Sequence, residues 1–157
     1  PLNFRWIGVI LRSIPEAKII HMHREPQATC FSIYTHLFSG NLGFDNKMSD
    51  IAAYYRLYNE LMKVWLTGGY RSKIFHLNYD NFVDQPAELS RKLFDYLNLD
   101  WNPAFIETRN SNRAVATASR MQVQRSIYKG SSSFWKRYEA YIDRSILDLS
   151  AFESDGL

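Results

Sequence analysis

The sequence predicts an α/β fold in which helices flank a parallel sheet. Two short apolar runs, residues 17–22 (AKIIHM) and 73–79 (KIFHLNY), have the length and composition of buried strands. Segments with helical spacing precede, separate and follow these runs, an order typical of layers around a parallel sheet. The 157 residues, 46% of them apolar, are enough for one domain with a sizeable core.

The first third of the chain alternates helix, strand and helix. Residues 4–13 form a predicted short helix that Pro15 ends. The run 17–22 follows as a strand that we expect to be covered on both faces. Pro26 suits the first position of the next helix, predicted over residues 26–39. Within that helix Cys30 lies on the apolar side and is interpreted as a packing residue.

The longest predicted helix begins at Ser49 or Asp50, which suit an N-cap, and ends at Gly68. Its apolar stripe consists of Ile51, Tyr55, Tyr58, Met62 and Trp65. After the strand 73–79, a further helix begins near Pro86 and buries Leu89, Leu93 and Leu97. Two short helices, 132–141 and 144–152, are expected to close the chain.

Composition excludes several classes of protein. Gly and Pro are infrequent, which argues against a disordered linker, and no apolar run approaches the ~20 residues of a membrane span. The first residues lack the pattern of a secretory leader. With one cysteine, Cys30, the chain holds no intrachain disulfide. A reducing compartment fits the single cysteine, and we expect a cytoplasmic protein without membrane or nucleic-acid partners.

Positive charge is concentrated in one segment. The net charge is +3, yet residues 108–138 contain seven basic and no acidic residues. Residues 102–130 also lack helical or strand periodicity, and loops of that length in compact domains are usually functional or disordered. Basic and hydroxyl residues alternate in this loop, which favours an anion-binding surface over a merely solvated loop.

Arg24 and Ser32 form a second candidate anion site. Arg24 comes directly after the first strand and Ser32 lies eight residues on, in the following helix. Ligands of open α/β sheets bind outside the carboxyl ends of strands, where a guanidinium and a hydroxyl suit phosphate. From spacing alone, a surface ion pair and a solvent-facing serine remain the alternative. Tyr79, at the end of the second strand, could stack on a base or simply border the core.

His21 and His23 are two apart and therefore face the same side of the first strand. Two such imidazoles could bind a metal, but no third ligand is evident in the sequence. We assign them no metal role and expect them to be hydrogen-bonded.

Several segments resemble the sulfotransferases that use 3′-phosphoadenosine-5′-phosphosulfate (PAPS), especially bacterial enzymes similar to tyrosylprotein sulfotransferase. The similar segments, in the family's order, are PEAKIIHMHREPQATCFSIY, YYRLYNELMKVW, IFHLNYDNFVDQPAEL and TASRMQVQRSIY. The resemblance implies a P-loop-NTPase-like sheet. It also implies that residues 1–157 are the C-terminal part of a sulfotransferase domain, because the family's phosphosulfate-binding turn and catalytic base lie upstream of the first similar segment.

The resemblance also implies roles for particular residues. Arg24 and Ser32 match the pair that binds the donor's 3′-phosphate, and Tyr79 matches the tyrosine on its adenine side. Ser119 to Tyr128 match the loop that covers the nucleotide, with contacts implied from Ser119, Gln122, Arg125 and Tyr128. No catalytic residue and no metal ligand is assigned.

The expected function is therefore transfer of a sulfuryl group from PAPS to a hydroxyl or amine of a small molecule or peptide. This chain would supply the 3′-phosphoadenosine half of the site and would be inactive alone; a homodimer could cover the edge of its sheet. The alternative is a non-catalytic nucleotide- or polyanion-binding module, in which the basic loop and the nearby Trp101, Tyr128 and Trp135 could bind single-stranded nucleic acid by charge and stacking.

Overall fold

The computed structural model describes residues 2–36, 38, 40, 42–106 and 130–149. Helices and two strands make up this part of the chain. Their order is η1 (Asn3–Trp6), α1 (Ile7–Ser13), β1 (Ile19–His23), α2 (Pro26–Thr35), α3 (Met48–Thr67), η2 (Arg71–Lys73), β2 (Ile74–Asn78), α4 (Tyr79–Asp84), α5 (Pro86–Leu97), η3 (Pro103–Phe105), η4 (Ser131–Tyr141) and α7 (Arg144–Leu147).

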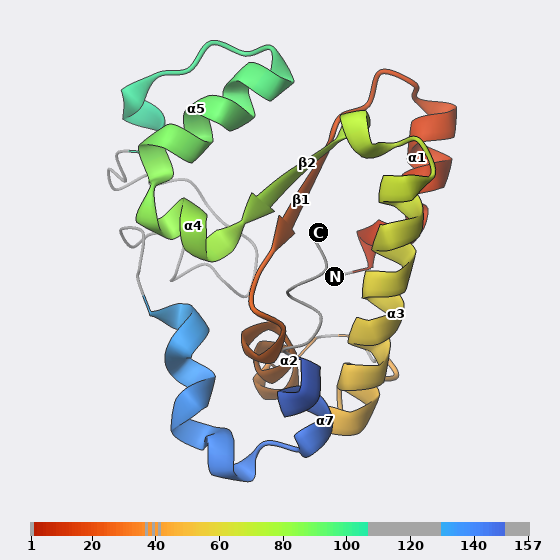
Figure 1. The fold of residues 1–157 in the computed structure, drawn as a ribbon, viewed down its shortest axis with the longest axis vertical. Helices are drawn as coiled ribbons and strands as arrows, with labels where there is room; N and C mark the ends of the chain where they lie inside the picture. Colours follow the sequence, from red (N-terminus) through yellow and green to blue (C-terminus); the bar gives the residue numbers. More distant parts are fainter. Residues whose placement is uncertain (1, 37, 39, 41, 107–129, 150–157) are drawn as a thin grey trace.

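The two strands pair in parallel, as the sequence predicts. The register runs from Ile19 opposite Ile74 to His23 opposite Asn78. α2 and α3 form the crossover between the strands. Figure 1 shows α1 and α3 on one side of the strand pair and α5 on the other. The α/β class is thus confirmed. β1 begins two residues and ends one residue later than predicted, and β2 is one residue shorter than predicted at each end.

Among the described residues, one face of β1 stays partly exposed, which corrects the expectation of a strand covered on both faces. Ile20 is 44% exposed and Met22 is 52% exposed. Of the described helices, α5 packs on this face over β2, where the ring centroids of Phe75 and Tyr96 are 5.2 Å apart. The apolar composition of β1 predicted burial, but the described helices cover only the opposite face of this strand.

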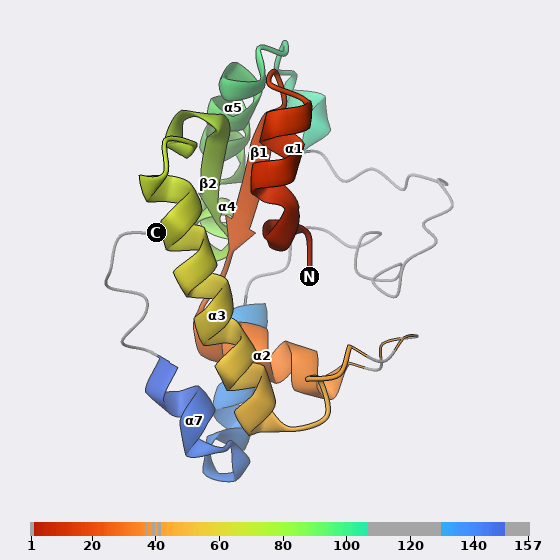
Figure 2. The ribbon, with the colours of Figure 1, turned by 90° about the vertical axis from the view of Figure 1, so that its right-hand side faces the viewer.

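The core consists of two clusters that α3 connects. Figure 2 shows α3 extending from α1 and the sheet at one end to α2 and α7 at the other. The cluster beside the sheet contains Ile7, Leu11, Met62 and Ile74. The cluster between α2, α3, η4 and α7 contains Ala28, Cys30, Phe31, Ile51, Ala52, Trp135, Ile142, Ile146 and Leu149. None of the five residues of the predicted α3 stripe is exposed, so the stripe is confirmed.

Two helix boundaries in the first half differ from the prediction. α3 begins at Met48, and its N-cap Lys47 makes no side-chain capping bond. The stop is as predicted, because the backbone N–H of Gly68 donates to the carbonyl of Val64 at 2.8 Å. α2 ends at Thr35, four residues before the predicted end. In the described part of the chain no helix is long and apolar enough to cross a membrane.

The second half departs further from the prediction. The strand was expected to include Tyr79, which instead begins α4, a helix that the sequence analysis missed. Asn78 caps α4, since its side-chain oxygen accepts from the N–H of Asn81 at 3.0 Å. η4 is a 3₁₀ helix of 11 residues near the predicted range 132–141. α7 covers only the first part of the predicted helix 144–152.

Candidate functional site

Arg24 and Tyr79 meet where the two strands end. Arg24 follows the last residue of β1 and Tyr79 follows the last residue of β2. Because His23 pairs with Asn78 in the parallel register, the next residues emerge side by side at the same edge. The central guanidinium carbon of Arg24 lies 5.4 Å from the centroid of the Tyr79 ring. A cation over an aromatic ring at strand ends can receive a phosphate and a base.

The first residues of η4 complete this group. Arg24 Nε donates to the hydroxyl oxygen of Ser132 at 2.7 Å, and the Ser132 hydroxyl donates to the carboxylate of Asp80. Nearby, the indole N–H of Trp135 donates to Glu25 Oε2 at 2.8 Å. Consecutive residues after β1 therefore bind two residues of η4. We refer to Arg24, Tyr79, Asp80 and Ser132 as the Arg24 site.

The other predicted contacts are not part of the observed group. Ser32 is exposed on α2, and its backbone carbonyl accepts a bond from the Thr35 hydroxyl at 3.4 Å. Among the described residues, no hydrogen bond joins Ser32 to Arg24. The remaining predicted contacts lie outside the described residues: Ser119, Gln122, Arg125 and Tyr128.

Sequence reasoning missed two members of the site, Asp80 and Ser132. Asp80 directly follows Tyr79, so the same argument about strand ends could have included it. Ser132 belongs to a run of three serines after Gly130, and nothing in the run distinguishes this serine from its neighbours. Its contact with Arg24 joins residues 108 positions apart, which no local pattern reveals.

A cluster of imidazoles lies beside the Arg24 site on the α3-facing side of the sheet. His21 Nδ1 is 3.0 Å from His76 Nδ1, and His21 Nε2 is hydrogen-bonded to the Tyr58 hydroxyl. The His23 ring stacks on that of His21 with centroids 5.7 Å apart. His76 thus joins the two histidines that the sequence placed on one face. The expected hydrogen bonding of His21 is confirmed.

Burial holds these imidazoles neutral. Desolvation, reinforced by His76 and His23, lowers the pKa of His21 to about 3. Desolvation also lowers the pKa of His23, although the Asp80 carboxylate acts in the opposite direction. The pKa of His76 is lowered by burial, by His23 and by Arg71. Across the described residues, no group of three or more His, Cys, Asp or Glu side chains is arranged to hold a metal ion.

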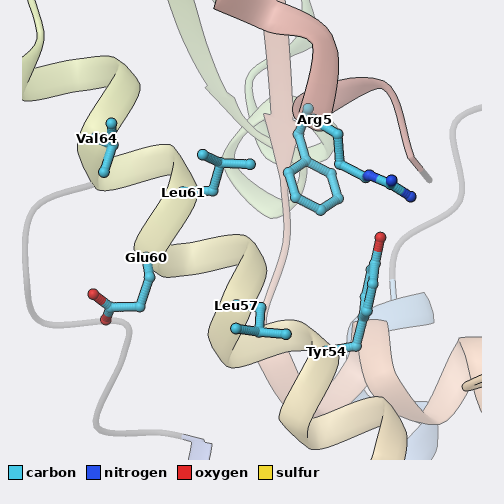
Figure 3. A pocket seen from close by; sticks show the side chains of 7 residues that line it. Arg5, Tyr54, Leu57, Glu60, Leu61 and Val64 are labelled. Atoms are coloured by element: carbon cyan, nitrogen blue, oxygen red, sulfur yellow. The ribbon is translucent and has the colours of Figure 1, made fainter.

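A separate groove lies between η1 and α3. Phe4, Leu57, Leu61 and Val64 supply its apolar walls (Figure 3). Arg5, Tyr54 and Glu60 complete the lining. The groove shares no residue with the Arg24 site.

Comparison with known proteins identifies the family of this chain. A model of the sulfotransferase family matches residues 1–103, about two thirds of the chain. The chain belongs to the sulfotransferase family. Within this sulfotransferase-family chain, Arg24, Tyr79 and Asp80 lie inside the matched range, whereas Ser132 lies beyond it. The suspected family is therefore confirmed.

A relative of this sulfotransferase-family chain occurs in Aquifex aeolicus (strain VF5), where it is described as an uncharacterized protein. It is 32% identical over 145 residues, which cover 90% of this chain. The same alignment covers 19% of the relative, so the chain spans about one fifth of that protein's length.

Proposed function

We propose that the Arg24 site binds the 3′-phosphoadenosine part of PAPS in a protein that transfers a sulfuryl group to a hydroxyl or amine. The observation that carries this proposal is the position of Arg24 over Tyr79 at the carboxyl ends of two parallel strands. That edge is where open α/β sheets bind their ligands. Membership of the sulfotransferase family supports the same reaction class.

The residues of the site fit a nucleotide phosphate. Arg24 uses Nε for Ser132, and within the described part of the chain no hydrogen bond occupies its two terminal nitrogens. These nitrogens can donate to two oxygens of a phosphate. Tyr79 lies against the same guanidinium and supplies an aromatic surface on the adenine side. PAPS supplies the sulfuryl group, which passes to the acceptor with release of 3′,5′-bisphosphoadenosine (PAP).

The proposal extends to Ser32, which is not hydrogen-bonded to Arg24 among the described residues, and to four residues outside the described part of the chain. Ser32 adds a hydroxyl for the 3′-phosphate, and the basic segment adds Ser119, Gln122, Arg125 and Tyr128. In this proposal β1 and β2 are part of a wider P-loop-NTPase-like sheet, and the chain forms the C-terminal, 3′-phosphoadenosine half of the domain. The groups that bind the phosphosulfate and remove the acceptor's proton belong to the other half.

Binding of PAP and 5′-AMP, measured by titration calorimetry, tests the proposal. The chain should prefer PAP, because only PAP carries the 3′-phosphate. Arg24→Ala should weaken PAP binding by about 2 kcal/mol, roughly 30-fold, as expected for a charge-assisted hydrogen bond. Arg12→Ala is the matched control, since it removes the same charge from an exposed position on α1.

The same titrations separate this function from a polyanion-binding module. A polyanion binder would follow charge and salt concentration alone, without preferring PAP over other nucleotides of equal charge. Equal affinity of Arg24→Ala and the wild type for PAP would refute the assignment. Because the proposed catalytic groups lie outside this half, the chain incubated with PAPS and phenols, alcohols or amines should give no sulfated product. Turnover that Arg24→Ala abolishes would show that the catalytic groups lie within these residues.

A further inference from the structure

The hydrogen bonds around Ser132 have a fixed direction. A serine hydroxyl has one proton and two lone pairs. The carboxylate of Asp80 can only accept, and the Nε–H of Arg24 can only donate. Ser132 therefore gives its proton to Asp80 and accepts from Arg24 at 2.7 Å. With a carboxylate at Asp80, the protons can be donated in one direction only, from Arg24 to Ser132 and from Ser132 to Asp80.

This order keeps the guanidinium available for a ligand. A carboxylate in direct contact with an arginine commonly takes two of its donors in a bidentate pair. Here the hydroxyl stands between the charges and occupies Nε alone. Four N–H donors remain on the terminal nitrogens and can donate to the oxygens of a phosphate. The negative charge of Asp80 offsets the positive charge of Arg24, while its carboxylate accepts from Ser132 and leaves those N–H donors available.

Three further contacts fix the positions of Arg24, Ser132 and Asp80. Tyr79 and Asp80 are the first residues of α4, whose N-terminus is capped by the Asn78 side chain. The Tyr79 ring restricts the guanidinium from one side. On η4, the bond from Trp135 to Glu25 fixes the helix one turn beyond Ser132.

We propose that Ser132 and Asp80 are positioning residues that hold Arg24 ready for the 3′-phosphate and so set the preference for a 3′-phosphorylated nucleotide. This inference rests on the proposed function, because it assigns the Arg24 site to the donor nucleotide. Ser132 acts through Arg24 Nε, and Asp80 acts through the Ser132 hydroxyl. Neither residue touches the ligand itself. A guanidinium fixed before binding loses less conformational entropy when the phosphate arrives.

PAP and 5′-AMP affinities of Ser132 variants test the proposal. Ser132→Ala should weaken PAP binding about tenfold, because Arg24 is then no longer fixed before the phosphate arrives, and should leave 5′-AMP binding within about twofold. Ser132→Thr should restore PAP binding, because threonine keeps the hydroxyl. Ser133→Ala is the matched control, since the neighbouring Ser133 is exposed and its hydroxyl donates to the carbonyl of Gly130 at 3.0 Å.

Two further comparisons exclude a purely structural or repulsive role. Lysine has no Nε–H, so in an Arg24→Lys background Ser132→Ala should cause no additional loss of PAP affinity. Asp80→Asn keeps an acceptor for Ser132 and should bind PAP within about threefold of the wild type, whereas Asp80→Ala should match Ser132→Ala. If Asp80 only repelled the phosphate, both Asp80 variants would bind PAP more tightly.

The outcomes separate failure of the proposed function from failure of the positioning role of Ser132 and Asp80. A wild-type chain that does not prefer PAP over 5′-AMP refutes the proposed function and this inference with it. A wild-type preference that Ser132→Ala leaves intact refutes only the positioning role. Equal losses for PAP and 5′-AMP in Ser132→Ala would show general damage to η4 and would also overturn the inference.

Discussion

Mild acid should destabilise the fold through His21. This side chain is 8% exposed, and burial together with the neighbouring imidazoles lowers its pKa to about 3. In the unfolded chain its pKa returns to about 6.5. Between these two pKa values, His21 is protonated in the unfolded state but not in the folded state. The free energy of unfolding is therefore unaffected by His21 above pH 6.5 and decreases as the pH falls below that value.

The size of the loss follows from the two pKa values. Each pH unit between them costs about 1.4 kcal/mol, so lowering the pH from 7.5 to 5 removes about 2 kcal/mol of the free energy of unfolding. His23 and His76 also have lowered pKa values and add to the loss. The side-chain hydrogen bonds of Glu88 and Asp143 lower the pKa of each carboxyl below its ordinary value of 4.5 or 3.8, so both carboxyls titrate below this window.

Urea unfolding followed by tryptophan fluorescence measures this effect. With a slope of about 2 kcal/mol per molar urea, the midpoint should fall by about 1 M between pH 7.5 and pH 5. His21→Asn should reduce that difference, and the control His36→Asn, at an exposed position, should leave it in place. A wild-type midpoint that does not change with pH, or a His21→Asn variant with the full change, would refute the reasoning.

Three further predictions concern the core. Burial raises the pKa of the Cys30 thiol to about 12, so a thiol reagent at pH 8 should modify this residue only after unfolding. Gly8→Ala should lower the free energy of unfolding by about 1–3 kcal/mol, because the new Cβ would lie 2.7 Å from the Trp65 ring; normal stability in urea would contradict this. Ile146→Ala should cost about 2–5 kcal/mol in the same assay, since this α7 side chain is 0% exposed; a smaller loss would mean that α7 contributes little to the core.

Local pattern was sufficient to predict most of the helices and both strands. The α3 stripe was found because a 3.6-residue period places apolar residues on one side, and the structure buries that side. The same reasoning predicted a helix at η4 but not its 3₁₀ type, because 3₁₀ runs longer than three or four residues are uncommon. Nor could it show that Ile20 and Met22 are exposed, since apolar composition does not report which helices reach a strand.

The candidate site was predictable in part for the same reason. Arg24 and Tyr79 follow adjacent strands, so their proximity is a consequence of parallel pairing. Ser132 comes from a segment with no such rule, and its position depends on how η4 packs against α2. His76 was missed as the partner of His21 because the pairing register, which sets them opposite one another, is not visible in either strand alone.

The residues of the Arg24 site come from three segments that are far apart in the sequence. The affinity of the chain for a ligand of this site therefore reports whether folding is complete. Its two hydrogen bonds close loops of 108 and 52 residues, so they form only when the end of β1, α4 and η4 have come together. A ligand that needs this arrangement binds the native state alone, and at a hundred times its Kd it adds about 2.7 kcal/mol to stability. Copies that have not docked η4 would retain Arg24 without its support and would compete poorly for ligand. A ligand of this site would then act as a selective stabiliser, extending the lifetime of correctly assembled molecules over that of incomplete ones.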